Sequence, residues 1–108
     1  MTVHVVLFRP KPDVTEAQRE ALFEAMRAAA RGIPTVRGFR IGRQLAQPPQ
    51  YVLSGFPSFP WVALLEFDDA DGLRTYLAHP LHHTLGQQFN AAAEAALIYD
   101  YEIAEKLR

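Results

Sequence analysis

The sequence predicts an α+β protein built from one antiparallel sheet with helices packed on one face. Three observations carry this prediction: two short segments are apolar on both faces, two longer regions have helical features, and the last segment alternates. Doubly apolar segments are typical of strands covered on both sides, and alternation is typical of strands with two unlike faces. In chain order the segments read β-α-β-β-α-β, which is the ferredoxin-like arrangement.

The first half of the chain contains a strand, a helix and a second strand. Residues 3–9 (VHVVLFR) form the first predicted strand, and prolines follow it. The predicted helix over residues 15–32 begins with a capping box, in which Thr15 is the cap and Gln18 lies three places later. Residues 36–44 alternate and predict a half-exposed strand.

The second half of the chain repeats this order with an interrupted helix. Residues 61–67 (WVALLEF) predict the second doubly apolar strand. Aspartates stand at the start of the next segment. Because carboxylates favour helix N-termini, these aspartates predict a short helix over residues 72–78. Pro80 interrupts this helix, and a second helical piece is expected at about residues 81–95. Residues 96–104 predict the last strand.

The sheet face opposite the helices is predicted to be apolar as well. The first strand and the strand over residues 61–67 carry apolar side chains on both faces. A large apolar face left in water is unusual for a soluble protein, so we expect a second copy of the chain to cover it. The predicted assembly is a homodimer whose two sheets form an α/β barrel.

Composition excludes several classes of protein. The 108 residues suit one domain, 49% of them are hydrophobic, and none is cysteine, so disulfides and thiolate metal sites are absent. Eleven basic residues are interspersed with twelve acidic ones, so the basic surface of a nucleic-acid-binding protein is missing. The opening segment is too short to span a membrane and lacks signal-peptide features. We expect a cytoplasmic protein that binds neither nucleic acid nor membrane.

The connection between residues 44 and 61 is long and rich in proline and aromatic residues. Connections of this length are uncommon in compact domains and tend to be surface excursions, lids or binding loops. We expect a surface excursion whose aromatic residues pack on the domain or its partner, with a lid over a pocket as the alternative.

The segment TYLAHPLHHTLG, residues 75–86, contains three of the four histidines. His79 precedes the proline and is expected to cap the short helix, and His83 is expected to be solvated. The three imidazoles do not predict a metal site, because a proline interrupts the helical spacing and no acidic residue nearby completes a ligand set. We therefore expect no metal and no cofactor.

Several pieces of the chain resemble the stress-responsive A/B barrel domain (Dabb) family. They are HVVLFRPKPDVTEAQRE, IPTVRGFRIGR, ALLEFDDADGLRTYLAHPLH and ALIYDYE, which cover nearly the whole chain apart from the proline-rich connection. The resemblance implies a single domain over residues 1–108, a ferredoxin-like dimer and a barrel of two sheets. It implies no defined reaction, since most members have none assigned and some are linked to the stress response.

One plant branch of this family consists of polyketide cyclases, which close a linear poly-β-keto chain by an aldol reaction. The resemblance implies that Tyr76 and His82 form the site, that Asp100 supports the histidine, and that His4 lines the pocket. The sequence departs from this branch at Trp61, where the cyclases have a histidine. It departs again over residues 91–96, where small side chains replace bulkier ones.

The chemistry of an aldol closure suits these residue types. His82 would act as the general base, Tyr76 would donate a hydrogen bond to the developing oxyanion, and Asp100 would orient the imidazole of His82. We expect the pocket to lie between helices and sheet. Its predicted lining residues are His4, Val6, Phe8, Leu22, Phe23, Met26, Leu85 and Ile98.

Three functions remain open at this point. The first is a homodimeric protein that binds a small apolar or aromatic molecule without an assigned reaction. The second is a polyketide cyclase or aldol-type lyase that uses the residues above. The third is a monooxygenase-like enzyme without a cofactor, which would share the fold and the dimer. Because fold resemblance does not carry function with it, we adopt the first description and keep the second and third as alternatives.

Overall fold

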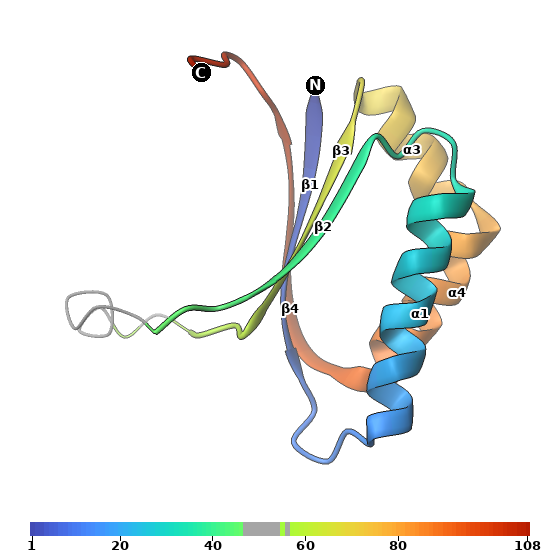
Figure 1. Ribbon diagram of the computed structural model, residues 1–108, viewed down its shortest axis with the longest axis vertical. Coiled ribbons are helices and arrows are strands. Elements are labelled where there is room, and N and C mark those ends of the chain that lie inside the picture. The colour runs from blue at the N-terminus through green and yellow to red at the C-terminus, as the bar shows by residue number, and fades with distance from the viewer. Residues whose placement is uncertain (47–54, 56) are drawn as a thin grey trace.

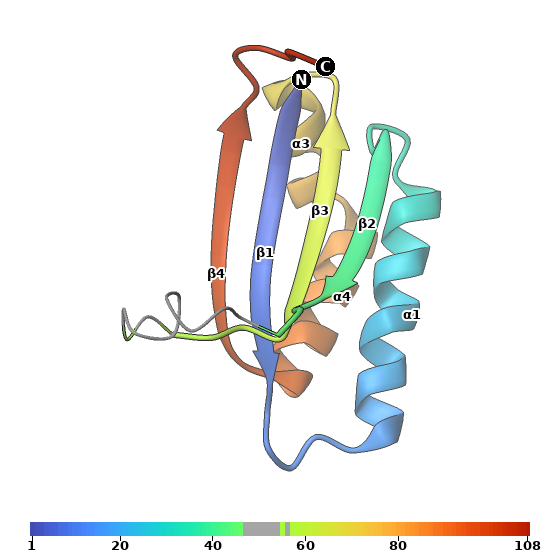
Figure 2. The ribbon, with the colours of Figure 1, turned by 60° about the vertical axis from the view of Figure 1, so that its left-hand side comes forward.

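A four-stranded antiparallel sheet forms one layer of the molecule. The computed structural model describes residues 1–46, 55 and 57–108. The sheet order is β2-β3-β1-β4, so the first strand lies in the centre beside the last one, as Figure 2 shows. This order confirms the predicted ferredoxin-like fold. The elements are β1 (Thr2–Pro10), α1 (Glu16–Gly32), β2 (Gly38–Arg43), β3 (Trp61–Phe67), α3 (Ala70–Ala78), α4 (Pro80–Ala92) and β4 (Ala93–Glu102).

Helices α1, α3 and α4 cover the same face of the sheet (Figure 1). Burial alternates along β1. Val6 and Phe8 face the helices and are buried, whereas Val5 and Leu7 point to the other face and are half-buried. The core forms where the buried face of β1 and β3 meets the apolar stripe of α1, which contains Leu22, Met26 and Ala29. None of the helices in the described ranges is long and apolar enough to cross a membrane.

The capping box at the start of α1 is confirmed. The hydroxyl of Thr15 accepts a hydrogen bond from the backbone N–H of Gln18 at 3.1 Å. The side chain of Gln18 in turn accepts one from the backbone N–H of Thr15 at 2.9 Å. This pair satisfies two donors that the first helical turn would otherwise leave without partners.

The boundary between α4 and β4 lies earlier than the sequence predicts. The helix ends at Ala92 rather than at residue 95, and the strand begins at Ala93. Alanine is compatible with a helix, but here the pairing of β4 with β1 starts at the level of Ala93 and Pro10. An ion pair of 2.6 Å between Arg9 and Glu94 joins the two strands at this point. Tertiary pairing therefore overrides the local helical preference.

The second face of the sheet is open in the single chain and is mainly apolar, with Arg40 and Glu66 as charged members. Tyr99 and Tyr101 of β4 lie on this face and are 48% and 55% exposed. Tyr99 pairs with Val5 of β1, which pairs in turn with Leu64 of β3, whereas the row that begins at Tyr101 passes through Val3 to Glu66. The expected lid or surface excursion in the connection before β3 falls mainly on residues 47–54 and 56, which lie outside the described part of the chain.

Candidate functional site

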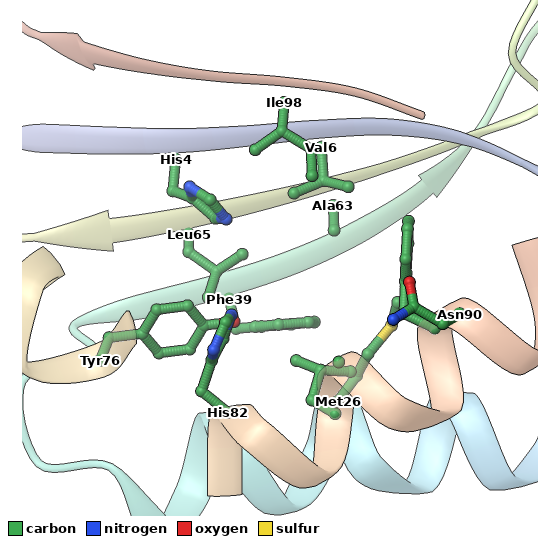
Figure 3. Close-up of a pocket in the computed structure, with 13 residues that line it drawn as sticks. His4, Val6, Met26, Phe39, Ala63, Leu65, Tyr76, His82, Asn90 and Ile98 are labelled. Atoms are coloured by element: carbon green, nitrogen blue, oxygen red, sulfur yellow. The ribbon is translucent and has the colours of Figure 1, made fainter. Parts of the chain in front are cut away.

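A cavity of about 220 Å³ lies between the sheet and the helices. Most of its wall is apolar, and its polar groups come from four side chains on three elements: His4 on β1, Tyr76 on α3, and His82 and Asn90 on α4. Figure 3 shows His4 projecting from the sheet and Tyr76 and His82 projecting from the helices toward the same space. Among the described residues, the lining is His4, Val6, Met26, Phe39, Ala63, Leu65, Tyr76, His82, Leu85, Gly86, Phe89, Asn90 and Ile98.

Five of the eight residues expected in the wall of the cavity are found there: His4, Val6, Met26, Leu85 and Ile98. The other three, Phe8, Leu22 and Phe23, lie in the core and at its margin rather than in this lining. Phe8, for example, is 1% exposed.

Aromatic packing explains where Phe8 and Phe23 lie. The ring of Phe8 lies between those of Trp61 and Phe89, with centroid distances of 6.4 and 5.5 Å. The ring of Phe23 packs on Trp61 at 5.2 Å. Trp61, the position that departs from the plant cyclases, therefore completes an aromatic cluster beside the cavity and is not part of its lining.

Six lining residues were missing from the prediction. Alternation along β3, read outward from Phe67, places Ala63 and Leu65 on the helix face and could have identified both. Spacing of four along α4, starting from His82, could have identified Gly86 and Asn90. Phe39 and Phe89 join the wall through sheet register and helix packing, which the sequence alone does not reveal.

The break at Pro80 brings Tyr76 and His82 together. His79 ends α3 and begins α4, and its Nδ1 accepts a hydrogen bond of 3.0 Å from the backbone N–H of Leu81. Pro80 then occupies the first helical position, where it loses no hydrogen bond. The rings of Tyr76 and His82 consequently meet edge to face, with centroids 4.8 Å apart.

Burial favours the neutral forms of both side chains. It raises the pKa of Tyr76 to about 12. The pKa of His82 is lowered by burial and then by the nearby imidazole of His4, and a hydrogen bond with the backbone of Leu77 opposes this shift. Tyr76 is therefore a protonated hydroxyl at neutral pH, and His82 is biased toward the neutral imidazole that a general base requires.

Asp100 pairs with a different histidine from the one expected. The sequence placed its carboxylate on His82, whereas the structure places it 2.5 Å from Nδ1 of His4. The reason is strand register, because His4 of β1 and Asp100 of β4 are direct partners in the sheet and share the face toward the helices. When the carboxylate accepts a hydrogen bond from Nδ1–H, Nε2 of His4 remains available to the cavity as a second polar atom.

Asp100 also borders a second hollow at the end of the sheet. Acidic side chains line much of this hollow, including those of Asp68, Asp69 and Glu102. Within the described ranges, no three histidine or acidic side chains are grouped as metal ligands would be. The carboxylate of Asp100 is 44% exposed, so it connects the buried imidazole of His4 to solvent.

The chain is similar to proteins with different activities. It is 24% identical over 98 residues to olivetolic acid cyclase from Cannabis sativa, which covers 91% of this chain and 92% of the relative. The structure of hydroxynitrile lyase from Passiflora edulis has a TM-score of 0.80 at 17% identity and covers 99% of this chain and 96% of that one. A dimeric ferredoxin-like protein from Thermobifida fusca has a TM-score of 0.75 at 20% identity, with 94% and 90% covered.

The family itself follows from a match to nearly the whole chain. The model of the stress responsive A/B barrel domain (Dabb) matches residues 2–103, which includes every strand and helix described above and all four polar residues of the cavity. The structural neighbours, at less than 25% identity, agree with the fold. The chain is a member of the stress responsive A/B barrel domain family.

Proposed function

We propose that the protein binds a small, largely apolar carbonyl compound in the cavity and transfers a proton at the carbon next to the carbonyl group. One observation carries this proposal: a histidine biased toward its neutral form and a neutral tyrosine hydroxyl meet in a cavity that is otherwise mainly apolar. A cavity of about 150 Å³ is sufficient for benzene. The cavity of about 220 Å³ therefore has room for a single ring and a short chain.

The residues divide the chemistry between them. His82 removes a proton from the carbon, and Tyr76 donates a hydrogen bond to the oxygen on which negative charge develops. The resulting enolate forms a carbon–carbon bond in an aldol reaction; in the reverse direction that bond breaks and the carbon is protonated. His4, oriented by Asp100, offers Nε2 as a second polar contact for the bound molecule. An aldol-type cyclase or lyase is the reaction class that this arrangement supports best.

Two relatives support this class. One is named as a cyclase and one as a hydroxynitrile lyase, and both are similar to this chain over more than nine tenths of its length. Departures of this chain from the plant cyclases at Trp61 and over residues 91–96 alter the surroundings of the cavity rather than the four polar residues. We therefore propose a shared type of proton transfer with a different substrate.

Deuterium exchange tests the proposal directly. Benzylacetone carries one aromatic ring and one ketone, and its carbons next to the ketone exchange slowly in neutral deuterium oxide without a catalyst. We expect the wild-type protein to accelerate this exchange, measured by NMR, and His82→Gln to remove the acceleration. An exposed control, His83→Gln, should retain it. Exchange at the uncatalysed rate with wild-type protein would refute the proposed chemistry.

We also propose that two copies of the chain pair through the open face of the sheet. The face is mainly apolar, and the two exposed tyrosines at its edge would be buried by a second copy. The neighbour from Thermobifida fusca is described as dimeric, which supports this arrangement. Two sheets packed face to face would give the α/β barrel.

A further inference from the structure

Gly86 lies in the middle of α4 and has no packing reason to be glycine. A Cβ built at this position meets no atom within 4 Å, whereas one built on Gly32 would lie 2.4 Å from Leu81. Glycine inside a helix lowers stability relative to alanine, because it gains no packing and loses more conformational entropy on folding. The position lines the cavity. The space beside Gly86 is therefore cavity space.

Gly86 lies between two polar residues on the same face of α4. His82, Gly86 and Asn90 follow one another at intervals of four residues, and all three line the cavity. A rise of 1.5 Å per residue separates His82 from Asn90 by about 12 Å along the helix axis. Figure 3 shows Asn90 at the opposite end of the cavity from Tyr76. Asn90 is exposed, so this end is open to solvent.

We infer that the ligand is an elongated molecule with polar groups at both ends, seated over the bare backbone of Gly86. Its carbonyl end lies at His82 and Tyr76, its single ring lies against Gly86, and a second polar group at the far end hydrogen-bonds to the amide of Asn90. Apolar side chains surround the middle of the cavity, among them Met26, Phe39 and Phe89. The amide of Asn90 can both donate and accept. This inference rests on the proposed function and specifies its substrate class.

The first experiment measures separately how a methyl group at position 86 affects helix stability and ligand binding. In Gly86→Ala we expect the melting temperature of the free protein to rise by about 4 °C, because alanine is the better helix former and nothing opposes its methyl group. We expect the affinity for benzoylacetone, measured by calorimetry, to fall about tenfold or more.

The matched control is Gln87→Gly, which places a glycine on the neighbouring exposed position of the same helix. This variant should lower the melting temperature and leave the affinity unchanged. A lower melting temperature in Gly86→Ala would contradict the open space beside Gly86. Equal affinity of Gly86→Ala and wild type would contradict the role of that space in ligand binding.

The second experiment tests the contact at Asn90. Benzoylacetone and para-hydroxybenzoylacetone share the same carbonyl end and differ by one hydroxyl at the far end of the ring. We expect the hydroxyl compound to bind wild type several-fold more tightly than benzoylacetone, and we expect Asn90→Ala to abolish this difference between the two compounds. Equal affinities in wild type, or a difference that persists in Asn90→Ala, would overturn the assignment of Asn90.

The outcomes distinguish this inference from the proposed function. If wild type binds the two diketones and His82→Ala weakens the binding of both, the proposed site is supported. The Gly86 and Asn90 variants then test only the inferred substrate class. If wild type binds neither compound, both the site and the inference are wrong.

Discussion

His82 carries the most informative electrostatic environment in the molecule. Burial lowers its pKa below the usual value of 6.5, His4 adds to this shift, and the backbone of Leu77 opposes it. An unfolded chain therefore takes up a proton at this histidine more readily than the folded chain does. The free energy of unfolding increases with pH wherever the unfolded state binds more protons. His82 therefore lowers the free energy of unfolding as the pH falls through 6.5 toward the lower pKa of the folded state.

His82→Gln tests this sign. We expect the free energy of unfolding of the wild-type protein to decrease between neutral pH and pH 5, and the decrease to be smaller in His82→Gln. Urea denaturation at a series of pH values measures this difference. His83→Gln is the control, because His83 is exposed beside it on the same helix. An identical pH dependence in wild type and His82→Gln would show that His82 is not desolvated.

Tyr76 gives the opposite pH dependence at the alkaline end. Its pKa is about 12 in the folded protein and 10 as the usual value, so the unfolded chain loses the proton first as the pH rises. We expect stability to fall between pH 10 and pH 12, and Tyr76→Phe to lack that part of the fall. The phenyl ring retains the packing against Phe67 and His82. Denaturation of both proteins over this range, compared with Tyr99→Phe, measures the effect.

Residue identity predicted part of the site, and strand register decided the rest. Alternation placed His4 with Val6 and Phe8, and it placed Asp100 on the face opposite Tyr99 and Tyr101, as the structure has them. It could not tell which histidine Asp100 contacts. That depends on pairing between strands 96 residues apart, and shifting the register would give Asp100 a different neighbour.

At the scale of elements, the junction of α3 and α4 controls the geometry of the site. His79 is the N-cap of α4, and it also closes α3 through a hydrogen bond of 3.2 Å from its backbone N–H to the carbonyl of Tyr76. We expect His79→Ala to lower stability by about 1 kcal/mol, because the N–H of Leu81 loses its acceptor. His79→Asn should recover most of this loss. Chemical denaturation of the three proteins provides the measurement, and equal stability would contradict the capping role.

Elements with strong local signals were predicted well. The capping box of α1, the strand over residues 61–67 and the helix break at Pro80 all depend on neighbours in sequence, and all three are confirmed. The end of α4 was predicted wrongly because the alanine-rich residues 91–96 favour a helix, whereas residues from Ala93 onward pair with the central strand β1. Local preference fails where long-range pairing competes with it.

At the scale of the whole molecule, the open sheet face should determine the oligomeric state. We expect wild type to be a dimer in light scattering coupled to size-exclusion chromatography at micromolar concentration. Tyr99→Glu should be a folded monomer, because it places a charge in the proposed interface at a position that is 48% exposed in the single chain. Gln87→Glu, on the helix side, should remain a dimer. A monomeric wild type or a dimeric Tyr99→Glu would contradict the proposed interface.

The pairing of β1 with β4 also has a consequence for biosynthesis. The ribosome makes β1 first and β4 last, yet these strands are neighbours in the sheet, and the contact between His4 and Asp100 joins them. A nascent chain that lacks β4 leaves one edge of the central strand without its partner and one wall of the cavity without Ile98. Closing so long a loop is slow compared with forming local helices. The binding site is therefore completed only after β4 has been synthesised, and a translation product that ends before β4 does not contain it.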